Sequence, residues 1–117
     1  MIRRLLPALT GVALFLGLIH LGLSAFAWRD LNEGALWFAG SGLAIVLGGL
    51  VNGVMIRADP VDRVQRAVWV LANVLMAAFF GLAWTVLKAP QVVVGGVVFA
   101  LLCVGALSTR ASGPAPG

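Results

Sequence analysis

The chain has 117 residues, of which 62% are hydrophobic and 10% are charged, and its mean hydropathy is +1.07. A soluble domain has about 45–50% apolar and about 25% charged residues, so the composition excludes an ordinary soluble enzyme, a disordered chain and a disulfide scaffold. The formal net charge of +4 comes from basic residues that stand singly or in pairs between apolar runs, which excludes a nucleic-acid-binding patch.

Four apolar runs of membrane-spanning length follow one another, at about 5–27, 35–56, 67–87 and 92–107. A hydrocarbon core of ~30 Å needs about 20 apolar residues as a helix, and bilayer thinning or flanking residues accommodate the shorter fourth run. Helices satisfy every backbone group internally. We predict an all-α fold, an integral membrane four-helix bundle that forms one domain over residues 1–110, with a flexible cytoplasmic tail at 111–117.

The first predicted helix also has features of a secretory signal peptide. Arg3 and Arg4 form a basic start, and the Ala-Phe-Ala sequence at 25–27 resembles a cleavage site. The apolar run is longer than the usual core of about 7–15 residues, and it contains Pro7 and His20. We therefore expect a retained helix, with cleavage as the alternative.

His20 is the only histidine, and it lies about 10 Å below the outer boundary of the first helix. Ser24 is one turn further out, and Ser41 of the second helix is expected at a similar depth, so the three predict an outer polar cluster. A neutral imidazole bonded to a hydroxyl or a backbone carbonyl is the structural interpretation. The alternatives are contact with a quinone or another small molecule, haem ligation with Met76 or a symmetry mate as second axial ligand, and pH sensing.

The four tryptophans fall near helix ends, as in the aromatic belts at membrane interfaces. Trp28, Trp37 and Trp84 belong to the outer interface and Trp69 to the inner one. Anchoring is the expected role, with a stacking wall for an outer-side ligand as the alternative.

Glycines predict where helices pack closely. Lipid provides no hydrophobic drive between helices, so small residues allow backbones to approach. We expect these rows to pack within the bundle, with a dimer face as the alternative, and we expect the second helix to contact at least two neighbours. The packing residues that we predict are Gly40, Gly48, Gly49, Gly53 and, in the fourth helix, Gly96.

An inner polar layer is predicted at roughly 7–11 Å from the cytoplasmic boundary. Asn52, Asn73 and Cys103 share this depth, and a short loop joins the helices of the two asparagines. The asparagines are therefore placed to form an interhelical hydrogen bond, which is worth ~0.6 kcal/mol on average. A structural role is expected, with a polar ligand site as the alternative; a single cysteine excludes an internal disulfide.

The second loop combines a helix start with basic residues. Asp62 is expected in the first turn of the third helix, where a carboxylate favours the helix dipole, and Arg66 lies four residues later as an i,i+4 partner. Arg57, Arg63 and Arg66 are the residues that we expect to contact anionic lipid headgroups, if this loop has a role beyond anchoring.

Charge decides the orientation. With four helices both termini lie on one side, which then holds six of the eight Lys and Arg residues. The positive-inside rule places that side in the cytoplasm. We therefore expect a multi-pass protein of a bacterial inner membrane with both termini cytoplasmic.

No Asp, Glu, Lys or Arg lies inside a predicted span. Coupled transport normally requires such a group. The sequence also lacks a carboxylate pair, a Ser–His–Asp set, a metal-binding motif and a phosphate-binding glycine loop. We expect a protein that is not an enzyme, with no metal site and no resident cofactor.

The stretch 36–43 continued through Gly49 and Asn52, with His20 and Trp28 before it, resembles small four-helix bacterial inner-membrane proteins of unknown function. The resemblance covers the layout of the whole chain and implies topology without an activity.

Two functions are compatible with these features. The first is an accessory or scaffold subunit whose partners are the lipid bilayer and another membrane protein, or a second copy of itself in a homo-oligomer. The alternative is a small-molecule binding or permeation unit, for a quinone, lipid or haem, that uses the outer cluster around His20.

Overall fold

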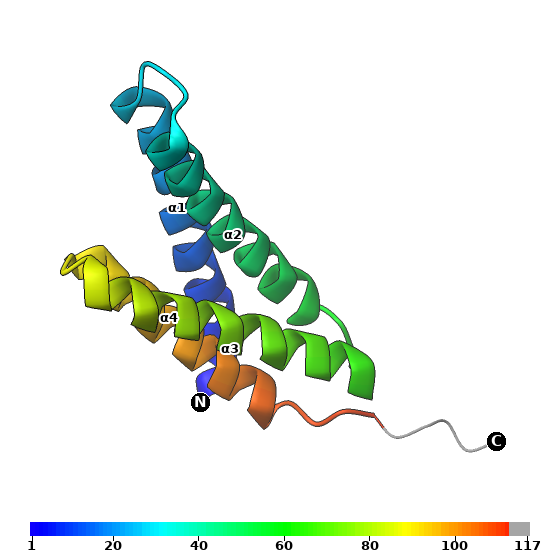
Figure 1. Cartoon of the computed structure of the whole chain (residues 1–117). Coiled ribbons are helices and arrows are strands. Elements are labelled where there is room, and N and C mark those ends of the chain that lie inside the picture. The colour runs from blue at the N-terminus through cyan, green and yellow to red at the C-terminus, as the bar shows by residue number, and fades with distance from the viewer. Residues whose placement is uncertain (113–117) are drawn as a thin grey trace.

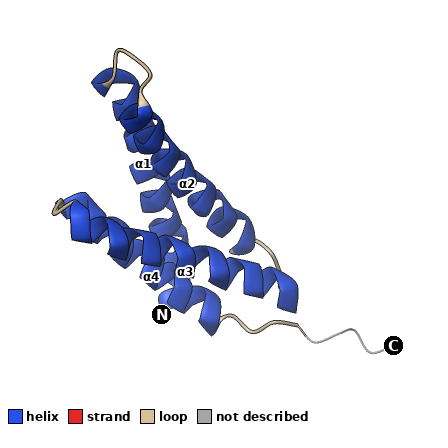
Figure 2. Ribbon diagram, viewed as in Figure 1, coloured by secondary structure: helices blue, strands red, loops and turns tan. Residues whose placement is uncertain are grey.

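The computed structural model describes residues 1–112, and the regular structure of this part of the chain is entirely helical. The helices are α1 (Ile2–Ala27), α2 (Glu33–Met55), α3 (Arg63–Val86) and α4 (Pro90–Ser108), as Figures 1 and 2 show. Each of them is long and apolar enough to cross a membrane. The prediction of an all-α fold with four helices of this kind is confirmed.

Local signals set the helix starts. Asn32 caps α2 by accepting a hydrogen bond from the backbone N–H of Ala35 at 2.9 Å. Asp62 caps α3 in a capping box with Gln65, so α3 begins four residues before the apolar run that predicted it. The expected pairing of Asp62 with Arg66 is therefore wrong. The carboxylate is used at the cap, and the Arg66 guanidinium donates to α4 instead.

The helices form two antiparallel hairpins. The most extensive contacts are those of α1 with α2 and of α3 with α4, while α1 with α4 and α2 with α3 join the hairpins more narrowly. In Figure 1 the hairpins diverge toward the α1–α2 and α3–α4 loops and come together where the chain begins and where α4 ends. We call these the loop end and the terminal end of the molecule.

Glycines hold α1 against α2. A Cβ atom on Gly17 would lie 2.8 Å from the backbone nitrogen of Val46, and one on Gly49 would lie 2.7 Å from Cδ2 of Leu14. Real Cβ atoms do not approach other atoms so closely, so the Val46 backbone excludes a side chain at Gly17, and one at Gly49 would force Leu14 to move. The interface is thus built on close backbone approach, as expected for helices in lipid.

The predicted packing glycines divide into three groups. Gly48 and Gly49 make tight contacts; a Cβ on Gly48 would lie 3.0 Å from the ring of Phe99, which joins α2 to α4. Gly53 and Gly96 have only ordinary contacts. Gly40 does not pack within the bundle, because nothing lies within 4 Å of its Cβ position, and the alternative of a dimer face stays a prediction. The tight positions that the prediction missed are Gly17, Gly42, Gly95 and Gly105.

The prediction that the second helix has several neighbours is confirmed. α2 packs on α1 along the hairpin and also contacts α3. Through Gly48 it reaches Phe99 of α4 as well. The helix with the most glycines therefore lies where three others meet.

Candidate functional site

A network of three side chains lies buried between α2 and α3, toward the terminal end. The amides of Asn52 and Asn73 bond each other in both directions, with nitrogen-to-oxygen distances of 2.9 and 3.1 Å. The Trp69 indole nitrogen donates to the Asn52 carbonyl oxygen at 2.7 Å. The asparagines are fully buried and Trp69 is 1% exposed. The expected meeting of the two asparagines across the hairpin is thus present.

The network leaves almost no hydrogen-bonding capacity unused. The second donor of Asn52 goes to the carbonyl oxygen of Gly48 at 2.8 Å, and that of Asn73 goes to the carbonyl oxygen of Trp69 at 2.9 Å. A side-chain amide has two donors and one acceptor oxygen. All four amide N–H groups are therefore paired inside the protein, which fits a structural role.

Two residues differ from their predicted roles, since Trp69 was expected as an anchor at the inner interface and Cys103 as a member of the inner polar layer. Trp69 does not serve as an exposed anchor, because its ring is buried and its N–H is used inside the bundle. Cys103 is half-buried with a free thiol, and the structure gives it no hydrogen bond to the network. A tryptophan one turn before Asn73 on the same helix is the sequence signal that could have identified the third member.

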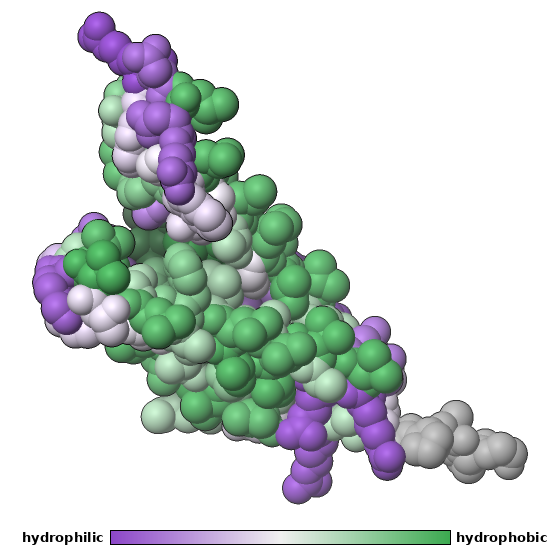
Figure 3. Space-filling model, viewed as in Figure 1, coloured by the Kyte–Doolittle hydropathy of each residue, from purple (hydrophilic) through white to green (hydrophobic). Residues whose placement is uncertain are grey.

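The angle between the two hairpins at the loop end forms a second feature, an apolar cleft of about 530 Å³. Its lining comes from all four helices, and Figure 3 shows the recess where the hairpins diverge. Ligand sites are typically clefts of about 300–1,000 Å³ with few polar groups. The residues that shape it most are His20, Phe38, Phe79, Phe80, Ala83 and Gln91.

His20 is the most distinctive residue of this cleft. Its ring stacks on Phe38, with centroids 3.8 Å apart and an interplanar angle of 22°. Its Nε2 atom is buried and has no hydrogen-bond partner. Within residues 1–112 the Thr10 hydroxyl is the other such atom, and it lines none of the cavities described. An unsatisfied buried group costs about 1–3 kcal/mol, so a molecule that reaches the imidazole nitrogen gains that energy.

The predicted serine partners of His20 do not bond to its ring. The Ser24 hydroxyl donates to the His20 carbonyl oxygen at 2.8 Å, and the Ser41 hydroxyl donates to the Trp37 carbonyl oxygen at 2.9 Å. Serines in helices often bond backward to their own turn in this way. Ser41 lines the cleft, whereas Ser24 does not. The expected polar cluster is therefore reduced to the His20 imidazole at this site.

Gln91 is a polar lining residue that the sequence analysis missed. It follows Pro90 at the start of α4, on the hairpin opposite to His20. No motif marks it. Its only sequence signal is an amide at the start of an apolar helix.

Two of the three arginines expected at headgroups bond to helix carbonyls. Arg66 donates to the Leu107 oxygen at 2.7 Å, which satisfies the carboxyl end of α4, and Arg57 donates to the Gly53 oxygen at 2.6 Å. Arg63 is exposed. Arg63 and Arg66 lie at the head of a shallow groove of about 410 Å³ with apolar walls from Val70, Leu71 and Leu107. Contact with headgroups stays a prediction.

The polar side chains of the cleft can form hydrogen bonds. No group of three or more His, Cys, Asp or Glu residues within 1–112 is placed to hold a metal ion. The imidazole and the Gln91 amide can each donate or accept a hydrogen bond.

Comparison of the chain with protein families, with curated proteins and with solved structures finds no match. The interpretation of the site therefore depends on its own geometry.

Proposed function

We propose that the protein is a non-catalytic, multi-pass protein of a bacterial inner membrane, with the terminal end in the cytoplasm. Four helices of spanning length support insertion. In Figure 3 the hydrophilic residues gather near the hairpin loops and the terminal end, with apolar surface between them. Six of the eight basic residues belong to the terminal end, which supports the orientation.

Its proposed function is to bind a lipid-soluble small molecule that carries a flat ring with polar substituents. The single observation that carries this proposal is the cleft of about 530 Å³ with the unsatisfied Nε2 of His20 in its wall. Since that nitrogen is covered in the empty cleft, binding requires a turn of the imidazole or a shift of Phe38.

A quinone fits the lining best. Three phenylalanine rings and the imidazole offer stacking surfaces, and aromatic pairs contribute about 0.5–1.5 kcal/mol beyond area burial. His20 and Gln91 stand on opposite hairpins, which suits a ring with a carbonyl oxygen at each end. Haem fits less well, because it needs a second axial ligand and Met76 is not among the lining residues.

The accessory-subunit function is the competing proposal. It was expected to use glycine faces, yet the tight contacts of Gly48 and Gly49 are made within the chain. Gly40 remains on the open surface of α2, together with Gly11 and Gly22 on α1 and Gly81 on α3. A partner helix on these positions would bind without the cleft, so the two proposals respond to different variants.

Titration with decylubiquinone, a short-tailed quinone, tests the proposed function. The Trp28 ring lies 4.8 Å from Phe38, so tryptophan fluorescence reports on the cleft. Ala83→Leu places three more carbons in the lining and is expected to weaken binding at least about tenfold by overlap with the ligand. Ala78→Leu, on the exposed surface of α3, is the matched control and should bind like the wild type.

A second variant separates ligand contact from folding. His20→Phe keeps a ring to stack on Phe38 and removes both nitrogens. Weaker quinone binding at unchanged helical content is the expected result. Equal quenching of the wild type, Ala83→Leu and His20→Phe would overturn the proposal.

A further inference from the structure

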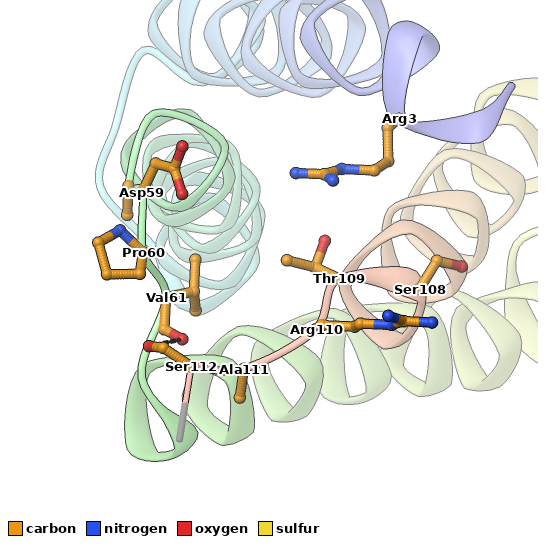
Figure 4. Close-up of a pocket in the computed structure, with 10 residues that line it drawn as sticks. Arg3, Asp59, Pro60, Val61, Ser108, Thr109, Arg110, Ala111 and Ser112 are labelled. Atoms are coloured by element: carbon orange, nitrogen blue, oxygen red, sulfur yellow. Dashed lines mark hydrogen bonds between the residues drawn. The ribbon is translucent and has the colours of Figure 1, made fainter. Parts of the chain in front are cut away.

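A pocket of about 370 Å³ at the terminal end gathers charged side chains from three separate parts of the chain. Arg3 comes from the first turn of α1, Asp59 from the loop between α2 and α3, and Arg110 from the segment after α4. Figure 4 shows the Arg3 guanidinium extending across the pocket above Thr109, with the Asp59 carboxylate on the facing wall. Neither the quinone cleft nor the amide network uses these residues.

These charged side chains do not form ion pairs with each other. Figure 4 marks no hydrogen bond between Asp59 and either arginine, and the structure gives no ion pair within 4.0 Å among the charged side chains of residues 1–112. Both signs of charge therefore face one pocket while separated from each other. A ligand that carries both signs can satisfy both walls.

The hydroxyl groups of the pocket further restrict which ligand groups can bind. Ser108 donates to the Val104 oxygen at 2.7 Å, Thr109 to the Gly105 oxygen at 3.1 Å, and Ser112 to the Val61 oxygen at 3.0 Å. Each hydroxyl has only one hydrogen to donate, so these oxygens can now only accept. The side-chain donor left for a ligand between the two walls is the Arg3 guanidinium, because the Arg110 side chain extends away from Arg3 and Asp59 in Figure 4.

We propose that this pocket binds a phosphate ester that carries a primary ammonium group, the headgroup chemistry of phosphatidylethanolamine. Arg3 holds the phosphate through charge-assisted hydrogen bonds. The ammonium donates to the Asp59 carboxylate and to the hydroxyl oxygens. A headgroup with negative charge alone meets the repulsion of Asp59, and a quaternary ammonium has no N–H to donate.

A smaller recess of about 110 Å³ adjoins the same pocket. It shares Arg3 and Thr109 with the polar pocket and adds Leu6, Pro7 and Met55. A polar pocket beside a recess with apolar side chains in its wall suits an amphiphilic ligand. This arrangement favours a lipid as the source of the headgroup over a free phosphate ester.

Arg66 is a neighbouring basic group with a different task, because it caps α4. The proposed site is distinct from the residues that the sequence suggested for headgroups, which were Arg57, Arg63 and Arg66. It shares membrane insertion with the proposed function and is independent of the cleft, so failure of either site leaves the other testable.

Native mass spectrometry of the full chain in nanodiscs of defined composition tests the site. We expect the wild type to retain phosphatidylethanolamine about fivefold more than phosphatidylglycerol or phosphatidylcholine. Asp59→Asn should reverse the preference between the first two. Arg3→Gln should lower retention of both about fivefold. Arg29→Gln, in the α1–α2 loop, is the matched control and should behave like the wild type.

Soluble phosphoethanolamine distinguishes the two sources of this chemistry. Displacement of the lipid by it assigns recognition to the headgroup alone, and resistance to displacement assigns it to the headgroup together with the recess; both support the pocket. Tighter retention of phosphatidylglycerol by the wild type, or an unchanged lipid ratio in Asp59→Asn, would overturn the proposal. Decylubiquinone binding by Asp59→Asn should equal that of the wild type, which separates this site from the cleft.

Discussion

The two halves of this molecule treat polar side chains differently. Toward the terminal end, Asn52, Asn73 and Trp69 bond one another and the nearby backbone until every side-chain N–H is paired. At the loop end, the buried Nε2 of His20 has no partner and stands in the wall of an open cleft. The first arrangement satisfies its own side-chain donors, whereas the second leaves a buried nitrogen without a hydrogen-bond partner.

This difference distinguishes buried polar groups that stabilise the fold from those that could bind a ligand. Buried amides that satisfy each other fix the register of α2 against α3, since a shift would leave several of them unpaired. A polar atom that the fold leaves unpaired beside a cavity can gain a hydrogen bond, and its free energy, from a ligand. Depth in the membrane did not distinguish the two, whereas hydrogen-bond saturation does.

The largest expected loss of stability is at Asn52, which bonds to both other members of the network. Asn52→Ala removes the acceptor of the Trp69 indole, the donor to the Asn73 Oδ1 atom and one of the two acceptors of the Asn73 Nδ2 atom. Because these groups stay buried without partners, we expect the free energy of unfolding to fall by about 2–4 kcal/mol. Denaturation in detergent with increasing dodecyl sulfate measures it.

A double variant sharpens this prediction. Asn52→Leu combined with Asn73→Leu removes both amides and leaves fewer orphaned groups than the two single changes taken together, because only the Trp69 indole N–H then lacks its partner. The double variant should therefore be less destabilised than the sum of the single ones. Additive losses would contradict a closed network.

Helix packing gives the next effect. Gly49→Leu is expected to destabilise the bundle by about 1–3 kcal/mol, because overpacking forces Leu14 and the α1 backbone to move. Gly40→Leu places the same side chain on the same helix in open space and should leave detergent stability unchanged. Equal stability and oligomer size of the two variants would show that the α1–α2 interface is not built as described.

A smaller effect is expected at the carboxyl-terminal cap of α4. Arg66→Gln removes the donor to the Leu107 oxygen and should lower the free energy of unfolding by about 0.5–1.5 kcal/mol. Arg63→Gln, one turn earlier and without such a bond, should change stability by less than about 0.5 kcal/mol. Thermal unfolding of both variants in one detergent compares them directly.

The smallest effect belongs to Ser41, although it lines the cleft. Its hydroxyl bonds only to its own helix. Ser41→Ala should therefore leave decylubiquinone affinity within about twofold of the wild type, while His20→Phe lowers it. A loss in Ser41→Ala as large as that in His20→Phe would mean that the hydroxyl turns toward the ligand.

Much of the fold follows from sequence patterns that have one physical solution. Four long apolar runs predict four helices, and equal depth on helices joined by a short loop predicts that Asn52 and Asn73 meet. Trp69 was misassigned because a tryptophan near a helix end suits both an interface and a buried donor. Only the facing helix decides between these roles.

The remaining errors concern which face of a helix points inward. Gly40 and Gly17 look alike in the sequence, and it is the packing of Val46 that makes Gly17 indispensable. The cleft arises from the divergence of two hairpins, which no periodicity encodes. Hence Gln91, on the far hairpin, could not be assigned to the site of His20. Ala111 and Ser112 fell in the predicted tail, yet Ser112 bonds to Val61, while 113–117 lie outside the described residues.

We propose that the loop-end cleft binds a small molecule while the terminal-end network stabilises the fold. Native mass spectrometry of the protein gently extracted from its own membrane, with an absorption spectrum alongside, tests it most directly. We expect a single chain or homo-oligomer that carries a ring-bearing, lipid-soluble molecule. This molecule should be lost in Ala83→Leu and kept in Ala78→Leu. A second polypeptide at fixed stoichiometry, with no small molecule in either variant, would contradict it and favour the accessory-subunit function.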